Sequence, residues 1–232
     1  MTRSEKNYSL YVDALPETLT LDVPAGETYR LNIAAFEKLK EKINIVVNVH
    51  QDARFLGAFA DFTDKPVSFY LTVNLLEDGS ECDWHLSCLS KGRGKKYFET
   101  SVNHLALHTN ALMSNYGIAK DESKMTFTGV SSIEQGAHKA KTRQEAKIIV
   151  FDPQADGICS PDLKISDNDV VATHAAVIGR LNQDHLFYLE SRGLSEKDAK
   201  RLIDLGYLKP VEDYFTDKEV IAKMDRVIEE GF

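Results

Sequence analysis

The sequence lacks the features that mark several common classes of protein. No apolar run approaches the ~18 to 20 residues of a membrane span, and the polar start contains no hydrophobic signal segment, so we expect neither a membrane span nor a secretory leader. The three cysteines, Cys82, Cys88 and Cys159, include no CxxC pair, which argues against a disulfide framework or a zinc ribbon. Reduced thiols are typical of a cytoplasmic protein, and we expect that location.

Catalytic and nucleotide-binding motifs are also missing. The chain contains no Gly-x-Ser-x-Gly, no His-Glu-x-x-His, no cysteine with a local catalytic signature and no Walker-type Gly-Lys-Ser/Thr ending. Its many carboxylates occur in charged turns or on helix faces. We therefore expect that the chain is not an enzyme and binds no nucleotide itself.

Basic residues are outnumbered in this chain. It has 28 Lys and Arg against 36 Asp and Glu, a formal net charge of -8. The only compact basic run, residues 91–96, is short and rich in glycine, which favours a solvated turn over a phosphate-binding loop. The charge balance argues against a nucleic-acid partner, because such proteins normally carry a basic face.

Short strand-like runs recur through most of the chain. They alternate apolar and polar residues and are separated by turn-forming segments, at residues 19–23, 43–49, 53–62, 67–75, 82–89, 96–106, 111–118, 124–130, 146–151 and 163–165. Such even spacing indicates a sandwich, a barrel or a β-solenoid, and the pattern alone does not choose among them. Good helix formers predict a helix at residues 34–42 between two of these strands.

Beyond Arg180 the apolar period changes from two to about 3.6, which predicts a helical tail. The first helix would begin after an Asn182 cap and end at Gly193. The second would begin at Ser195 and end before Gly206, and the third would run from Thr216 to near Gly231. We therefore divide the chain into a β core at residues 1–175 and a helical domain at residues 176–232.

Histidine and cysteine provide the candidate metal ligands. His174 ends the β-rich part on what would be a rigid frame, and Cys159 lies 15 residues before it. Near a solenoid edge the two could share a metal ion, since imidazole and thiolate suit iron and zinc, although their spacing matches no standard site. A structural, hydrogen-bonded histidine is the alternative. His104 and His108 should lie on one side of a strand, unrelated to a metal.

Three ordered segments resemble one family. Ala172-Thr-His-Ala-Ala-Val-Ile-Gly-Arg-Leu181, followed by Leu186-Phe-Tyr-Leu-Glu-Ser-Arg-Gly193, is similar to the most distinctive signature of the SufB/SufD family of the SUF iron-sulfur cluster assembly system. Upstream, Phe127-Thr-Gly-Val130 with the later Gly136-Ala and Arg143-Gln144 resembles another turn of that family, and Ser160-Pro-Asp-Leu-Lys-Ile165 resembles a third element. The first ~100 residues match only in general character.

The resemblance implies a mainly β fold: a right-handed parallel β-helix core with a small C-terminal helical domain. In that family the helical region binds SufC, an ABC-type ATPase, and paired SufB/SufD-type subunits form a scaffold for a nascent cluster. His174 falls on a SufD-type histidine associated with cluster formation, where a neutral imidazole could ligate iron. The implied cargo is a transient iron-sulfur cluster.

Two positions depart from the SufB pattern. SufB-type members have a Glu directly after the histidine, where this chain has Ala175, and their sulfur-transfer cysteine corresponds to about Ala146. Both departures indicate a short SufD-like or stand-alone member. Pairing with a SufB/SufD-type subunit or as a homodimer is expected.

The implied ATPase-docking residues lie in the helical tail: Leu186, Phe187, Tyr188, Arg192, Gly193 and Arg201. The leading hypothesis is thus a non-enzymatic scaffold that binds a SufC-like ATPase. The alternative is an adaptor of the same fold that regulates an ATPase and holds no cluster. A β-helix carbohydrate enzyme is disfavoured, because no acid/base pair stands out.

Overall fold

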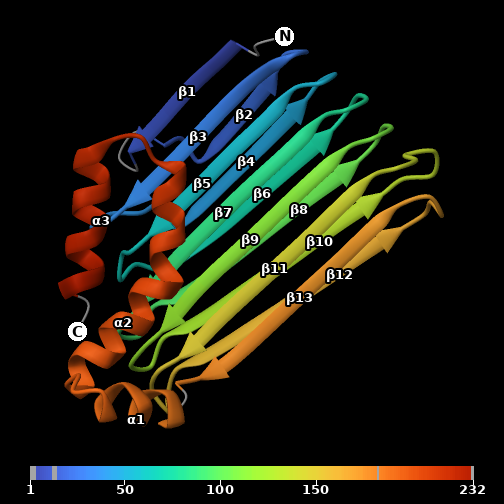
Figure 1. The fold of residues 1–232 in the computed structure, drawn as a ribbon. Helices are drawn as coiled ribbons and strands as arrows, with labels where there is room; N and C mark the ends of the chain where they lie inside the picture. Colours follow the sequence, from blue (N-terminus) through green and yellow to red (C-terminus); the bar gives the residue numbers. More distant parts are fainter. Residues whose placement is uncertain (1–3, 12–14, 182, 231–232) are drawn as a thin grey trace.

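The chain winds into a parallel β-solenoid and ends in helices that pack against it (Figure 1). This computed structural model describes residues 4–11, 15–181 and 183–230. The strands are β1 (Ser4–Tyr11), β2 (Thr18–Val23), β3 (Glu27–Ala35), β4 (Lys42–Val49), β5 (Arg54–Asp61), β6 (Val67–Leu75), β7 (Glu81–Ser90), β8 (Lys95–His104), β9 (Asn110–Ala119), β10 (Lys124–Ile133), β11 (Lys141–Val150), β12 (Asp156–Ile165) and β13 (Val171–Arg180). The helices are α1 (Gln183–Ser191), α2 (Glu196–Leu208), the 3-10 helix Lys209–Tyr214 and α3 (Lys218–Glu230).

Each turn of the solenoid adds one strand to each of two facing sheets. Over the described residues, the odd-numbered strands form sheet A in the order β1 to β13, and the even-numbered strands form sheet B in the order β2 to β12. Neighbouring strands in both sheets are parallel and in continuous register. The expectation of a β-helix core with C-terminal helices is confirmed, and the sandwich and the barrel are excluded.

Alternating side chains from the two sheets fill the solenoid interior. Strand β6 alternates strictly between buried and partly buried residues, as the period of two in its sequence predicts. Aromatic rings pack against each other inside: Phe69 and Trp84 stack nearly parallel with centroids 5.7 Å apart, and Phe98 and Phe127 of successive turns meet edge to face at 5.7 Å. The middle turns therefore have a packed apolar core that holds the later turns rigidly.

One buried ion pair interrupts this core. Lys96 and Asp61 have fully buried side chains, with 2.8 Å between Nζ and Oδ2. The ammonium also donates to the carbonyl oxygens of Thr63 and Leu89, and the other carboxylate oxygen accepts from the Thr63 backbone and hydroxyl. Because these charges are fully hydrogen-bonded, the pair can remain ionised away from water and join strands of both sheets.

The helices cover the outer face of sheet A. Leu208, Val211, Met224 and Ile228 pack in one buried cluster with strand residues that include Ile118. The Tyr214 hydroxyl donates to Asp83 at 2.7 Å, and its ring stacks on His85 at 5.5 Å between centroids. None of the helices in the described residues has the length and apolar character needed to cross a bilayer.

Several local predictions were wrong. Residues 34–42 form no helix, because Ala34 and Ala35 continue β3 and a loop leads into β4. Ser195 caps the start of α2 as predicted, because its hydroxyl accepts from the Asp198 amide at 3.1 Å. The helix then continues through Gly206 to Leu208, past the predicted end. Packing against the solenoid outweighs these local preferences.

The predicted ends of α1 and α3 agree only in part with those in the structure. Asp217 rather than Thr216 accepts from the first amides of α3. Gly193 follows α1 with a φ of +93°, as a C-terminal glycine should. The predicted cap Asn182 and the end at Gly231 lie outside the described residues. Strand β13 reaches Arg180, past the expected boundary at residue 175, and the separation of a helical domain stays a prediction.

Candidate functional site

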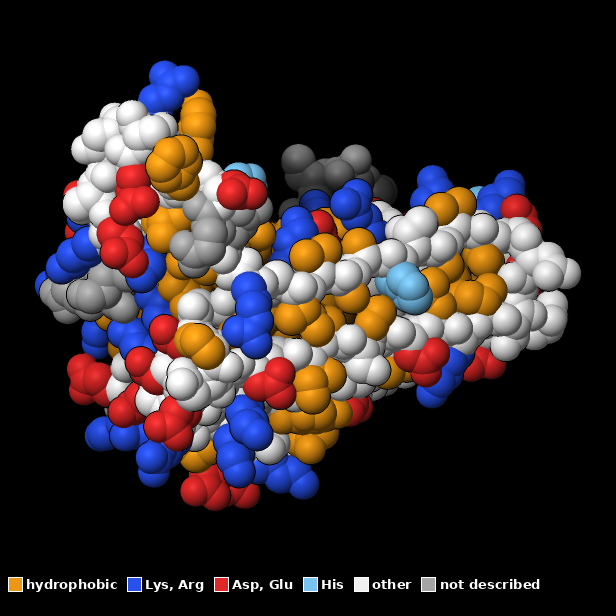
Figure 2. Space-filling model, turned by 90° about the horizontal axis from the view of Figure 1, so that it is seen from below, with side chains coloured by type: hydrophobic (Ala, Val, Ile, Leu, Met, Phe, Trp, Pro, Cys, Tyr) orange, Lys and Arg blue, Asp and Glu red, His pale blue; other side chains and the backbone are white. Residues whose placement is uncertain are grey.

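The last turn of the solenoid is uncapped. Strands β12 and β13 are the final strands of sheets B and A, so in the described residues each leaves one edge without a neighbouring strand. Ile165 and Ile178 are 40% and 50% exposed, although they follow the buried, inward-facing Ile133 and Ile148 in register. Figure 2, seen from this end, shows a strip of hydrophobic side chains along the strands. Solenoids normally cover such an end with a cap or another chain.

His174 lies on this open turn. It is in register with Gln144 of β11, whose side chain is buried inside the solenoid, so His174 faces inward as well. Because no further turn covers it, its side chain is exposed. The fold thus presents an imidazole at the mouth of the solenoid interior, held on a strand.

Polar side chains replace the aromatic core below His174. Gln144 donates to the Ser131 hydroxyl at 2.6 Å and to the carbonyl of Asp162 at 3.2 Å. Its own Oε1 is buried without a hydrogen-bond partner in the described part of the chain. One turn earlier, Asn115 donates to Thr100 at 3.0 Å. The interior therefore becomes polar toward the open end, and it leaves an acceptor there unsatisfied.

Cys159 also faces the inside of the last turn. It is in register with the buried Phe127 and is half-buried itself. Burial raises the pKa of its thiol to about 11, so the thiol stays protonated near neutral pH. Metal binding would require its deprotonation, because the thiolate is the ligand.

The structure does not place His174 and Cys159 side by side. His174 is the register neighbour of Gln144, and the Gln144 side chain donates to the backbone carbonyl of Asp162. Asp162 is therefore the part of β12 that lies across the turn from His174. Cys159 precedes Asp162 by three residues, or about 10 Å along an extended strand. A shared ion needs both ligand atoms within roughly 2.3 Å of it. Among the residues that the structure describes, no group of three or more His, Cys, Asp or Glu could hold a metal ion.

Asp167 fixes the loop between β12 and β13. Its carboxylate accepts from the backbone amides of Gly136 and Asp169, both at 2.9 Å, and from His138 at 3.1 Å. These bonds hold the pKa of Asp167 below its usual range, with the Asp169 amide the largest cause. Asp167 thus ties the last loop to the preceding turn and positions β13. The turn-forming sequence around it, Ser166-Asp-Asn-Asp169, was the available signal.

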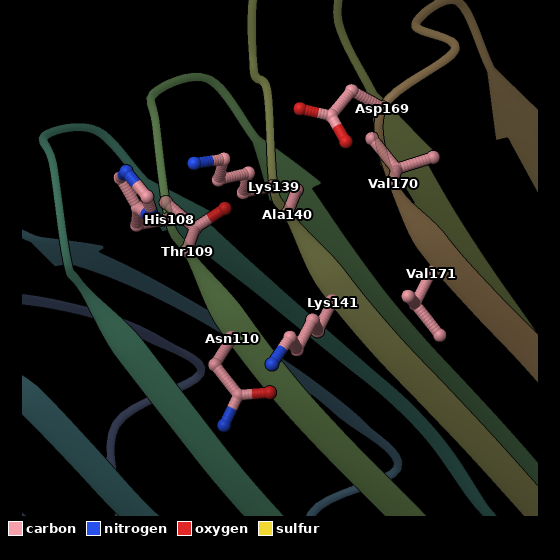
Figure 3. Close-up of a pocket in the computed structure, with 9 residues that line it drawn as sticks. All are labelled: His108, Thr109, Asn110, Lys139, Ala140, Lys141, Asp169, Val170 and Val171. Atoms are coloured by element: carbon pink, nitrogen blue, oxygen red, sulfur yellow. The ribbon is translucent and has the colours of Figure 1, made fainter.

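A cavity of about 370 Å³ lies outside this corner of the solenoid. In Figure 3 the side chains of Lys141 and Asn110, which are register neighbours on β11 and β9, extend toward one another, and Asp169 lies on the far side. Val171 of the open strand also lines it. The cavity therefore places charged groups beside the uncapped turn.

His104 and His108 are not on one strand. His104 ends β8 and is buried, with 2.8 Å between Nδ1 and the Thr109 hydroxyl, and burial lowers its pKa to about 4. His108 lies in the following turn with a φ of +58°. The prediction of a shared side was wrong, because the chain turns between them.

Helix α1 exposes part of the predicted docking set. Phe187 is 71% exposed and Tyr188 55%, and the Arg192 guanidinium lies 5.2 Å from the Tyr188 ring centroid. Leu186 is instead buried between α1 and α2, where it anchors the helix. Arg201 pairs with Glu229 of α3 at 2.6 Å. The surface available to a partner is therefore centred on Phe187 and Tyr188.

The fold and the site define the chain as a β-solenoid protein whose uncapped last turn carries an exposed histidine beside a helical tail. The chain belongs to the SufB/SufD family: the model described as SUF system FeS cluster assembly, SufBD core domain, matches residues 34–207. The match includes β4 to β13, α1 and most of α2. The resemblance stated from the sequence motifs is thereby confirmed.

Individual relatives agree with the family. The iron-sulfur cluster assembly protein SufD of Bacillus subtilis is 29% identical over 213 residues, covering 90% of this chain and 49% of the relative. The SufB protein of the same organism is 26% identical over 160 residues, covering 61% of this chain and 34% of the relative. A SufBD family protein of Staphylococcus haemolyticus is 24% identical over 184 residues, covering 78% and 38%. The chain thus spans half or less of these relatives.

Proposed function

We propose that this chain is a SufD-like scaffold subunit of an iron-sulfur cluster assembly complex. The observation that carries the proposal is the uncapped last turn with His174 at its mouth, in a chain that belongs to the SufBD core family. A SufB/SufD-type subunit, or a second copy of this chain, would cover that turn. The broader coverage of the SufD relative, together with Ala175 and Ala146, supports the SufD-like assignment.

The nascent cluster would be cargo held between subunits. His174 would supply a neutral imidazole to iron, and its register neighbour Gln144 has a buried side-chain oxygen without a hydrogen-bond partner among the described residues. Cys159 would serve only after deprotonation, as a ligand separate from His174. Because this chain offers too few ligands for a complete site, the covering subunit would complete the set.

A SufC-like ABC-type ATPase would bind the helical tail. The exposed Phe187 and Tyr188 offer an aromatic anchor with Arg192 beside them, which is the composition favoured at the centres of interfaces. ATP hydrolysis would then belong to the partner, and this chain would act without catalysis. We keep the cytoplasm as the expected location.

Mixing this chain with the SufC-like ATPase of its own host tests the docking claim. Size-exclusion chromatography should show a complex with the natural chain, and Phe187→Glu should weaken it at least tenfold because the charge enters an apolar contact. Lys197→Glu, a larger change of charge at an exposed position on α2, is the control and should leave the complex intact. Absence of any complex, or equal loss with both variants, would refute docking through α1.

A further inference from the structure

The two free strand edges of the last turn differ in the direction of their backbone groups. In β12, the amide of Asp156 and that of Ser166, just after the strand, both donate to the preceding turn at 2.9 Å. Because amide directions alternate along a strand, the even-numbered residues of β12 bond to β10, and the odd-numbered ones direct their amides to the free edge. In β13, the amides of Val171 and Leu181 donate to the preceding turn at 2.9 and 3.0 Å. There the even-numbered residues therefore face the free edge.

Strand β13 presents an unbroken row of backbone groups at its free edge. Each even-numbered residue has an amide and a carbonyl that no strand of the described chain uses: Ala172, His174, Ala176, Ile178 and Arg180. Residues 171–179 include no Asp, Glu, Lys or Arg. An uncharged strand edge with free amides and carbonyls is a template for pairing with another strand.

Strand β12 has no such row, because a proline interrupts it. Pro161 lies in the middle of the strand and belongs to the odd-numbered set, so the free edge has no donor at that point. The proline costs no bond to β10, since the even-numbered residues make those bonds. Asp162 and Lys164, both exposed, place charges beside it. Proline and charged side chains are means by which natural sheets keep an edge strand from pairing.

We propose that sheet A alone continues into the covering subunit: an edge strand of the SufB/SufD-type partner bonds to β13, and Pro161 keeps β12 from pairing. The inference rests on the proposed function, because it requires the partner invoked there. The apolar side chains of β12 are then covered by the partner without backbone hydrogen bonds. Since the backbone of His174 belongs to the bonded row, the pairing also fixes which partner residues lie beside the imidazole.

Proline substitutions on the two edges test which strand pairs. Ala176→Pro removes a free-edge donor of β13, and Leu163→Pro is the matched change on β12. Both variants should fold, because neither amide bonds to another strand of the described chain. In calorimetric titration with the SufB-type subunit of the same host, Ala176→Pro should weaken binding at least tenfold, since a partner carbonyl loses its donor. Leu163→Pro should leave the affinity nearly unchanged.

If a proline ring disturbs folding, replacing Ala176 or Leu163 by its α-hydroxy acid gives the same comparison, because only the N–H is lost and the side chain is kept. Equal weakening by the changes on β12 and β13 would overturn the inference and leave the scaffold assignment standing. Absence of any complex with the natural chain would overturn both.

Pro161→Ala tests the role of the proline in the free chain, without the partner. It restores a donor in the middle of the β12 edge and should raise the self-association constant about tenfold in sedimentation velocity. Pro153→Ala, in an exposed turn, is the control and should leave self-association unchanged. Unchanged self-association of Pro161→Ala would contradict the assignment of Pro161 as the residue that blocks pairing of β12.

Discussion

At the scale of the residue, His174 is distinguished by facing inward while remaining exposed. Inward-facing residues one turn earlier, such as Gln144, are buried and hydrogen-bonded, so the exposure of His174 follows from its place on the final strand. A histidine that served only the core would occupy an earlier turn. This placement supports a role in contact with another molecule.

His174→Ala should abolish most of the charge-transfer absorption that appears when the chain and its partner subunit are reconstituted anaerobically with iron and sulfide. The loss follows from removing an imidazole ligand. Thr173→Ala, on the outward face of the same strand, is the control and should retain the absorption. If His174→Ala also retained it, His174 would not be a ligand, and the cluster would be held by the partner subunit or by other residues of this chain.

Single residues were unequally predictable from the sequence. His174 could be found because it lies in a motif that resembles the SufB/SufD family. Its neighbour Gln144 lay in a weaker motif, and its buried position depends on strand register across one turn. The relation between His174 and Cys159 could not be predicted, since it depends on which residues of β12 and β13 face each other across the turn.

At the scale of the element, one ionisable pair holds α2 against the solenoid. Lys120 Nζ lies 2.6 Å from Asp204 Oδ2, and the other Asp204 oxygen is buried without a hydrogen-bond partner among the described residues. Burial raises the pKa of Asp204 to about 6 and lowers the pKa of Lys120. For both groups, the effect of burial on the pKa is thus larger than the opposing effect of the charged partner, although the two atoms lie close together.

The docking of α2 should therefore depend on pH through Asp204. Because the folded chain binds this proton more tightly than the unfolded chain, the contribution of Asp204 to stability is fully present below about pH 4 and is lost as pH rises through about 6. Relative to Asp204→Asn, the unfolding free energy of the natural chain should fall by on the order of 2 kcal/mol across that range.

Urea denaturation at several pH values measures this difference. Asp213→Asn, at an exposed carboxyl group near the end of the 3-10 helix, is the control and should follow the pH dependence of the natural chain. A difference between the natural chain and Asp204→Asn that does not change with pH would contradict the assignment.

Elements were predictable where local pattern and packing agree. Strands β2 and β4 to β10 matched because alternation of apolar residues coincides with the pleat of a two-sided solenoid, whereas β1 and β3 were missed and β11 to β13 were predicted only in part. Residues 34–42 were misassigned because their helix-forming composition is overridden by pairing of β3 with β5. The continuation of α2 through Gly206 was missed because the helix is held by burial of Leu208 and Ala199 rather than by local propensity.

At the scale of the whole molecule, the last turn of the described solenoid differs from the middle turns. The middle turns are sealed by neighbours on both sides, whereas β12 and β13 expose apolar side chains and strand edges. Exposed edges of this kind favour association with another chain. The choice of β-solenoid over sandwich could not be made from strand spacing, because each has similar strand lengths and turns; the family resemblance made it.

Amide hydrogen exchange of β12 and β13 tests the central claim, that another SufB/SufD-type subunit covers the last turn. In the free chain, the edge amides that point away from β10 and β11 should exchange rapidly. Adding the SufB-type subunit of the same host, or raising the concentration of this chain if it pairs with itself, should slow them at least tenfold. A stable complex in which these amides exchange as fast as in the free chain, with protection confined to other surfaces, would contradict the account.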